Sequence, residues 1–245
     1  MATDAQNSPF IKHLASSDKK TRDQALTSLR AFLSAQTEIS ELDLLKLWKG
    51  LFYCLWMQDK PKLQNRLSSD LASLPATLRP VVVLPFLRAF FLTIAREWIN
   101  IEALRLDKYL FLIRQYVNAS FKYLAREKWN EDMVKQWNGI MEEIPLNATE
   151  TKLPNGLRYH VLDIWVDELE KVEEGWAKEE MREALGRVME PVEKLAKDGR
   201  LKVVRTAAKE CLADERLQAW RGEAQDEVDE EMSDEKDEEW GGFDD

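Results

Sequence analysis

The hydrophobic and polar residues of this chain follow a helical spacing along most of its length. After a Ser-Asp capping signal at 17–18, residues 21–36 carry apolar side chains three and four positions apart. A second helix begins at Ser40, and Asp59 with Pro61 predicts the end of that helix and the N-cap and first turn of the next. The same pattern predicts helices over about 61–73, 79–99, 104–126, 130–143, 157–173, 177–198 and 201–220.

The segment LWKGLFYCLWMQDKP at 47–61 would be apolar on nearly every side of a helix. A helix of this kind is buried on more than one side or spans a membrane. The most apolar window, at 81–95, contains Pro85 and Arg88 and falls short of the roughly 20 apolar residues of a span. We therefore expect no membrane contact and a core helix with a buried Trp48. Its two apolar faces hold Leu44, Leu47, Trp48, Leu51 and Leu55 on one side, and Leu45, Phe52, Tyr53 and Trp56 on the other.

These features predict an all-α protein. With nine glycines and eight prolines the chain has too few turn residues for an all-β fold. Long helices joined by short loops favour stacked antiparallel helix pairs, in a HEAT-like α-solenoid or an irregular helical array. An inner helix of such a stack touches its own partner and the neighbouring pair, which accounts for two apolar faces. No clean sequence repeat is visible, and a compact irregular bundle is the alternative.

The acidity of the chain is concentrated at one end. Residues 223–245 hold thirteen acidic residues and one lysine, a balance of −12, while the formal net charge of the whole chain is −10. The remaining body is therefore close to neutral, at about +2, and is compatible with nucleic-acid partners. We expect disordered segments at 1–9 and 223–245. Within the tail, Trp240 and Phe243 predict a docking motif, with plain solubility as the alternative.

The sequence indicates no catalysis. His13 and His160 lie far apart without further ligands at metal spacing, so we expect no metal site and a packing or hydrogen-bonding role for His160. Cys54 and Cys211 lie in apolar helical patterns and predict buried, reduced thiols in an intracellular protein. There is no Gly-rich phosphate loop, nucleophile elbow or visible secretory signal. We expect a protein that is not an enzyme, has no cofactor and takes no small-molecule substrate.

Basic residues supply the candidate binding surface. In FKYLAREKW at 121–129 they alternate with aromatic residues, an arrangement that binds phosphates and stacks bases. The alternative is a solvated basic face over a core aromatic, and arginines also suit carboxylate partners. Two tryptophans near helix ends are candidate interface anchors. The candidate RNA-binding or partner-binding residues are Lys60, Lys62, Arg66, Arg88, Arg96, Arg105, Lys108, Lys122, Arg126, Lys128, Trp98 and Trp129.

Three long blocks resemble a known family. LWKGLFYCLWMQDKP at 47–61, REWINIEALRLDKYLFLIRQ at 96–115 and LPNGLRYHVLDIWVDEL at 153–169 resemble the ribosomal RNA-processing protein 1 family of nucleolar large-subunit assembly factors. The resemblance covers residues 8–172. We therefore expect a helical family domain at 10–172 and a charged helical extension at 173–222, whose helices are peripheral or dependent on a partner. The long loop at 145–156 is a possible division within the domain.

The resemblance implies a location in the nucleus and nucleolus. It also implies a non-catalytic assembly factor of the large (60S) subunit that supports processing of the internal transcribed spacers of pre-rRNA within the pre-60S particle. Its expected partners are pre-60S assembly factors, ribosomal proteins and pre-rRNA or large-subunit rRNA. Two alternatives are a scaffold that meets only proteins and a chaperone that binds basic ribosomal proteins through the acidic tail.

Overall fold

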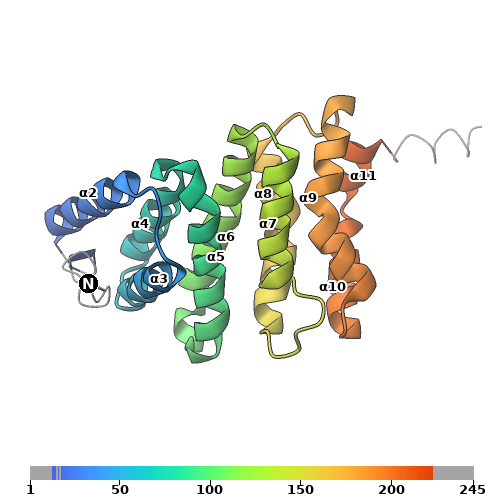
Figure 1. Ribbon diagram of the computed structural model, residues 1–245. Helices are drawn as coiled ribbons and strands as arrows, with labels where there is room; N and C mark the ends of the chain where they lie inside the picture. The colour runs from blue at the N-terminus through green and yellow to red at the C-terminus, as the bar shows by residue number, and fades with distance from the viewer. Residues whose placement is uncertain (1–12, 15, 17, 223–245) are drawn as a thin grey trace, which may run out of the picture.

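The structure, a computed structural model, describes residues 13, 14, 16 and 18–222 (Figure 1). Within these residues it contains ten α-helices, two short 3-10 helices and no strand, which confirms the all-α prediction. The expectations for 1–9, for the acidic tail and for Trp240 and Phe243 lie outside the described residues. The elements are α2 (Lys19–Ala35), α3 (Glu41–Trp56), α4 (Pro61–Ala72), η2 (Leu74–Thr77), α5 (Pro80–Glu97), η3 (Trp98–Asn100), α6 (Ala103–Arg126), α7 (Glu131–Glu143), α8 (Asn155–Val172), α9 (Glu179–Asp198), α10 (Lys202–Leu212) and α11 (Glu215–Arg221).

Local capping fixes several helix starts. The Asp18 carboxylate accepts a hydrogen bond from the Thr21 N–H at 2.8 Å, and Ser40 caps α3 in the same way. At α4 the expected aspartate cap is wrong, because Lys60 occupies the N-cap without a side-chain bond and Pro61 opens the helix. The single helix expected over 201–220 is also wrong. Asp214 accepts a hydrogen bond from the Arg216 N–H and starts a separate helix, α11.

The chain zigzags between two layers of helices. In one layer α3, α5, α7 and α9 pack in succession, and in the other α4, α6, α8 and α10 do the same. Figure 1 shows the helices side by side in an elongated row, with α2 at one end and α10 and α11 at the other. This order confirms the stacked helical array, since each inner helix contacts neighbours in its own layer. No described helix has the length and apolar character needed to cross a membrane.

The core of the array explains the two apolar faces of α3. Trp48 is 1% exposed, and its ring centroid lies 4.9 Å from that of Phe90 on α5 and 5.0 Å from that of Tyr116 on α6. Phe52, on the other face, stacks on Tyr109 of α6 at 4.5 Å. Both faces of α3 therefore reach α6 in the opposite layer, and the Trp48 face also packs on α5 in its own layer. The prediction that Trp48 is a core residue is confirmed.

The C-terminal helices are part of this same core. Leu185, Val188, Val192 and Leu195 of α9 are fully buried, and α9 packs on α7 while α10 packs on α8. The expectation that these helices are peripheral or need a partner is therefore wrong for α9. The charged residues of α9 and α10 lie on the outer face of each helix, because an amphipathic helix at the end of a stack buries only one stripe.

The loop that precedes α8 is held by one buried arginine. Arg158 is 2% exposed, and its guanidinium donates to the main-chain oxygens of Asn147, Glu150 and Leu153. Buried main-chain carbonyls need such donors. The long loop between α7 and α8 is consequently tied to the helix that follows it.

Candidate nucleic-acid interface

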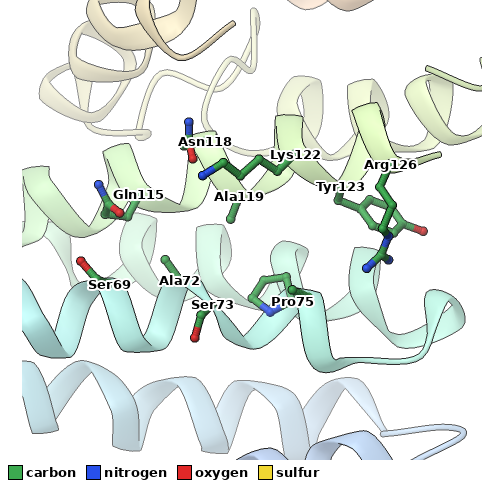
Figure 2. A pocket seen from close by; sticks show the side chains of 11 residues that line it. Ser69, Ala72, Ser73, Pro75, Gln115, Asn118, Ala119, Lys122, Tyr123 and Arg126 are labelled. Atoms are coloured by element: carbon green, nitrogen blue, oxygen red, sulfur yellow. The ribbon is translucent and has the colours of Figure 1, made fainter. Parts of the chain in front are cut away.

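A groove of about 430 Å³ runs between α4 with η2 on one side and α6 on the other (Figure 2). The two sides are joined beneath it, because the Tyr116 hydroxyl of α6 donates to the Leu71 carbonyl of α4 at 2.6 Å. Both groups are buried, so the bond is shielded from water. The lining residues are Ser69, Ala72, Ser73, Pro75, Ala76, Gln115, Asn118, Ala119, Lys122, Tyr123 and Arg126.

The lining is small, polar and basic. Ala72, Pro75 and Ala119 leave the middle of the groove open, while Gln115 and Asn118 present side-chain amides along its α6 side (Figure 2). None of the described residues that line the groove is acidic. An anion that enters the groove therefore meets no like charge on its walls.

Two cations stand one helical turn apart on the α6 side of the groove. Lys122 is exposed, and Figure 2 shows its chain directed along α6 toward Asn118. The Arg126 guanidinium carbon lies 5.2 Å from the centroid of the Tyr123 ring, a cation–π arrangement that orients the guanidinium. Arg126 also meets Glu127 at 3.4 Å. The structure thus brings the predicted Lys122 and Arg126 together on one groove.

The third basic residue of this segment has a different setting. Lys128 is exposed but does not line the groove, and its backbone is left-handed, with φ of 55°. Trp129 follows with φ of 54° and is 4% exposed, its ring 4.7 Å from that of Trp176. The candidacy of Trp129 as an exposed anchor is therefore wrong, because the left-handed turn directs its ring into the core.

The basic strip at the start of α4 is divided between free and paired cations. Lys60 and Lys62 are exposed, and neither forms an ion pair with the described residues. Arg66 instead meets Asp23 of α2 at 3.0 Å and Asp70 at 3.7 Å. It links α2 to α4, so its charge is already matched within the chain.

The arginines of the central region mostly join parts of the array. Arg88 contacts Glu41 of α3 at 3.0 Å and Glu143 of α7 at 2.5 Å, and its hydrogen bond lowers the pKa of Glu143. Arg96 pairs with Glu97 at 3.0 Å. Arg105 pairs with Glu102 and lies over the ring of Trp56. These arginines are thus paired with carboxylates of the chain itself, and neither RNA nor an acidic partner is needed to match their charge.

Lys108 and Trp98 also pack within the fold. Lys108 is 5% exposed, and its ammonium donates to the carbonyls of Trp56 at 2.8 Å and Gln58 at 3.0 Å. Burial lowers the pKa of Lys108. Its candidacy as a surface cation is wrong, because it caps the end of α3. Trp98 is half-buried and approaches Gly156 so closely that a Cβ there would lie 3.0 Å from the indole ring.

Several surface residues are not predicted by the sequence pattern. Ser69, Gln115 and Asn118 join the groove only because α4 and α6 pack together, and nothing in the local pattern marks them. Ile99 and Leu104 are 89% and 97% exposed, although they lie within an otherwise apolar block. Asp107 and Lys108 follow Leu104 at three and four positions, and this polar spacing is the signal that could have marked Leu104 as exposed.

The groups expected to be chemically inert are held in packed surroundings. Cys54 is buried as predicted, whereas the prediction of a buried Cys211 is wrong, because that residue is half-buried on α10. Loss of solvent around each sulfur raises the pKa of both thiols to about 12, which removes the reactive thiolate near neutral pH. His160 lies 2.8 Å from the Leu110 carbonyl through Nε2, which confirms its hydrogen-bonding role. No group of three or more histidine, cysteine or acidic side chains among the described residues could hold a metal ion.

Comparison with known proteins identifies the family. The model of the nucleolar protein family Nop52 matches residues 5–244, nearly the whole chain. The chain belongs to the Nop52 nucleolar protein family. This membership confirms the resemblance on which the family expectation rested, and it agrees with the expected location in the nucleus and nucleolus. The match also extends over α9, α10 and α11, beyond the 8–172 span of the resemblance.

The similar proteins come from distant eukaryotes. The chain is 42% identical over 169 residues to ribosomal RNA processing protein 1 homolog B of Homo sapiens, a match that covers 66% of this chain and 22% of the human protein. It is 37% identical to homolog A of the same species, with 66% and 36% covered. It is 31% identical to the Dictyostelium discoideum homolog, with 68% and 37% covered. The chain therefore spans well under half the length of these relatives.

Proposed function

We propose that this chain is a non-catalytic factor of large-subunit ribosome assembly that supports processing of the pre-rRNA internal transcribed spacers. The observation that carries the proposal is the match to a nucleolar family over residues 5–244, together with relatives whose names state ribosomal RNA processing. The proposal extends to this chain what those names say of longer proteins.

The described fold supports a binding role. A two-layer helical array offers extended surfaces on which partners can bind. The thiols of the buried Cys54 and the half-buried Cys211 are held neutral, and the carboxylates of the Arg88 contacts are engaged in ion pairs. From the family match and this fold together, we assign the chain to the pre-60S particle. There it contacts assembly factors, ribosomal proteins and pre-rRNA without cutting RNA.

Depletion of the protein in the organism that encodes it tests this function. Pulse-labelled pre-rRNA should accumulate as precursors that retain an internal transcribed spacer, and mature large-subunit rRNA should decline while small-subunit rRNA is still made. Re-expression of this chain should restore the normal pattern. Equal loss of both subunits, or unchanged processing, would contradict the proposal.

A second candidate function is a scaffold that contacts only proteins. The exposed Ile99 and Leu104 favour it, because large apolar side chains on a surface are characteristic of protein contacts. Ultraviolet crosslinking of the tagged protein, with sequencing of attached RNA, separates the two functions. Crosslinks focused on large-subunit rRNA or its spacers would support RNA contact. Co-purification of the particle without such crosslinks would support the scaffold.

A further inference from the structure

We infer that the groove between α4 and α6 binds the sugar-phosphate backbone of single-stranded RNA. This inference rests on the proposed function, which places the chain on pre-rRNA, and it assigns the contact to a particular surface. Lys122 and Arg126 would hold phosphates, and the neutral polar residues beyond Lys122, at the end of the groove away from Arg126, would meet the ribose.

The cations of the groove differ from Arg66, Arg88 and Lys108 in being unmatched or weakly matched within the chain. Arg66 and Arg88 each meet two carboxylates from elsewhere in the chain, and Lys108 is buried. Lys122 is exposed and forms no ion pair with the described residues, and Arg126 meets only the adjacent Glu127, at 3.4 Å. These two charges are thus available to an external anion, and both face a groove without an acidic lining residue.

The spacing of Lys122 and Arg126 fits the spacing of phosphates along a strand. Residues four positions apart on a helix are separated by roughly 6 Å along its axis. A nucleic-acid strand carries a phosphate about every 3.4 Å of stacked length. Lys122 and Arg126 therefore match phosphates one or two nucleotides apart along one strand. The stacking of Arg126 on Tyr123 holds its guanidinium ready for bidentate contact with phosphate oxygens.

The remaining lining residues suit a sugar-phosphate backbone better than bases. Ser69, Gln115 and Asn118 offer hydroxyl and amide groups that can bond to ribose hydroxyls. Tyr123 is the single aromatic residue among the described lining residues, and it is 4% exposed beneath Arg126. A base therefore has no free ring on which to stack. The groove should bind RNA with little preference for sequence.

The groove is too narrow for a duplex. Packed helices lie about 8–10 Å apart, so the groove between α4 and α6 is narrower than a double helix. A duplex would touch only the rim of this hollow, whereas a single strand can lie along it. An acidic peptide matches the charges but lacks the sugar hydroxyls that the neutral groups would bond.

Binding of labelled oligouridine to the purified full chain, measured over a series of salt concentrations, tests the inference. In a Lys122→Gln/Arg126→Gln variant we expect at least tenfold weaker binding. Each lost phosphate contact lowers the slope of log affinity against log salt by about 0.7, so the slope should fall by about 1.4. The matched control is Lys202→Gln/Lys209→Gln, which removes two exposed charges from α10 at the other end of the array (Figure 1).

A neutral variant separates the groove from general charge. Ala119→Trp fills the groove from α6 without altering charge, and it should weaken oligouridine binding as well. If the α10 control weakens binding as much as the groove variant, or if Ala119→Trp has no effect while melting normally, the groove is not the site. Tighter binding of a polyglutamate peptide than of oligouridine would assign the groove to an acidic peptide and overturn the inference.

The proposed function and the inference about the groove are contradicted by different results. If depletion impairs spacer processing but the groove variants bind oligouridine normally, the proposed function stands and the inference about the groove falls. If the groove variants lose oligouridine binding but depletion leaves processing intact, the site stands and the proposed function falls. Thermal melting of every variant confirms that altered binding does not reflect unfolding.

Discussion

The indole nitrogen of Trp48 donates a hydrogen bond to the main-chain carbonyl of Phe86, 3.0 Å away. The bond joins α3 to α5 in the middle of the core. The ring also lies within 5.0 Å of the rings of Phe90 and Tyr116, so one side chain connects three helices of the array.

Truncation of the Trp48 side chain should lower the free energy of unfolding more than a substitution on the surface does. For Trp48→Ala we expect a loss of about 3–5 kcal/mol in the free energy of unfolding, because a large cavity forms in a packed core. Trp48→Phe keeps an aromatic ring but loses the bond to Phe86, and should cost less. Chemical denaturation monitored by circular dichroism measures both. A near-normal midpoint for Trp48→Ala would contradict the core assignment.

Lys108 should behave as a structural residue. Its ammonium satisfies the carbonyls of Trp56 and Gln58 where α3 ends, and Lys108→Met removes that donor while keeping much of the chain volume. Hydrogen bonds from charged groups contribute about 1.5–3 kcal/mol, so we expect a loss of that size. The control is Lys62→Met, at an exposed position of α4. Equal melting temperatures for the two variants would show that Lys108 does not cap α3.

The left-handed turn between α6 and α7 should tolerate glycine. Lys128 has φ of 55°, a left-handed conformation that costs a residue with a Cβ about 1–2 kcal/mol. Lys128→Gly relieves this strain but adds freedom to the unfolded chain, so we expect a net gain of about 0.5–1 kcal/mol. Lys135→Gly, at an exposed position within α7, should instead lose about 1 kcal/mol. Thermal melting that moves both variants in the same direction would argue against the turn geometry.

Acid should weaken the contact between α8 and the helices beside it. Asp167 lies 2.7 Å from Arg114 of α6 and 3.0 Å from Arg216 of α11. Burial raises the pKa of Asp167, but the hydrogen bonds from Arg216 and Arg114 outweigh burial and lower it below the ordinary 3.8. A carboxyl with a depressed folded pKa stabilises the fold above its unfolded pKa and loses that effect as pH falls through the folded value.

The corresponding test compares the wild type with Asp167→Asn over a pH series. The variant should melt at a lower temperature near neutral pH, and the difference should shrink as pH falls below about 3.8. A difference that stays constant down to the acid transition would show that the ionised carboxylate does not contribute through these two arginines.

The boundary at residue 172 can be tested directly. A fragment of residues 1–172 would expose the faces of α7 and α8 that α9 and α10 cover. In the full chain α9 buries Leu185, Val188 and Leu195 in the core, so its removal leaves apolar side chains of the fragment uncovered. We expect the fragment to bind a hydrophobic dye and to melt without a cooperative transition. A fragment that melts cooperatively near the temperature of the full chain would establish 10–172 as an independent domain.

Much of the fold could be predicted because the helices of this chain are strongly periodic. Ser40 and Asp18 marked helix starts through short-range capping, and the two apolar faces of 40–57 marked an inner helix. Errors arose where local signals conflicted, as at Lys60, or where a single side chain interrupted a periodic run, as at Asp214. These are differences of one turn, which hydrophobic spacing alone does not determine.

The sequence by itself determined the helical class, the burial of Trp48 and the concentration of acid after residue 222, because these depend on neighbours along the chain. Only the tertiary structure decided which cations stay available. Lys108 and Lys122 look alike in sequence, yet one ends beneath α3 and the other beside an open groove. That difference depends on which helices pack together. A cation is drawn to whatever carbonyl or carboxylate the distant parts of the chain bring within reach, and no local pattern records those positions.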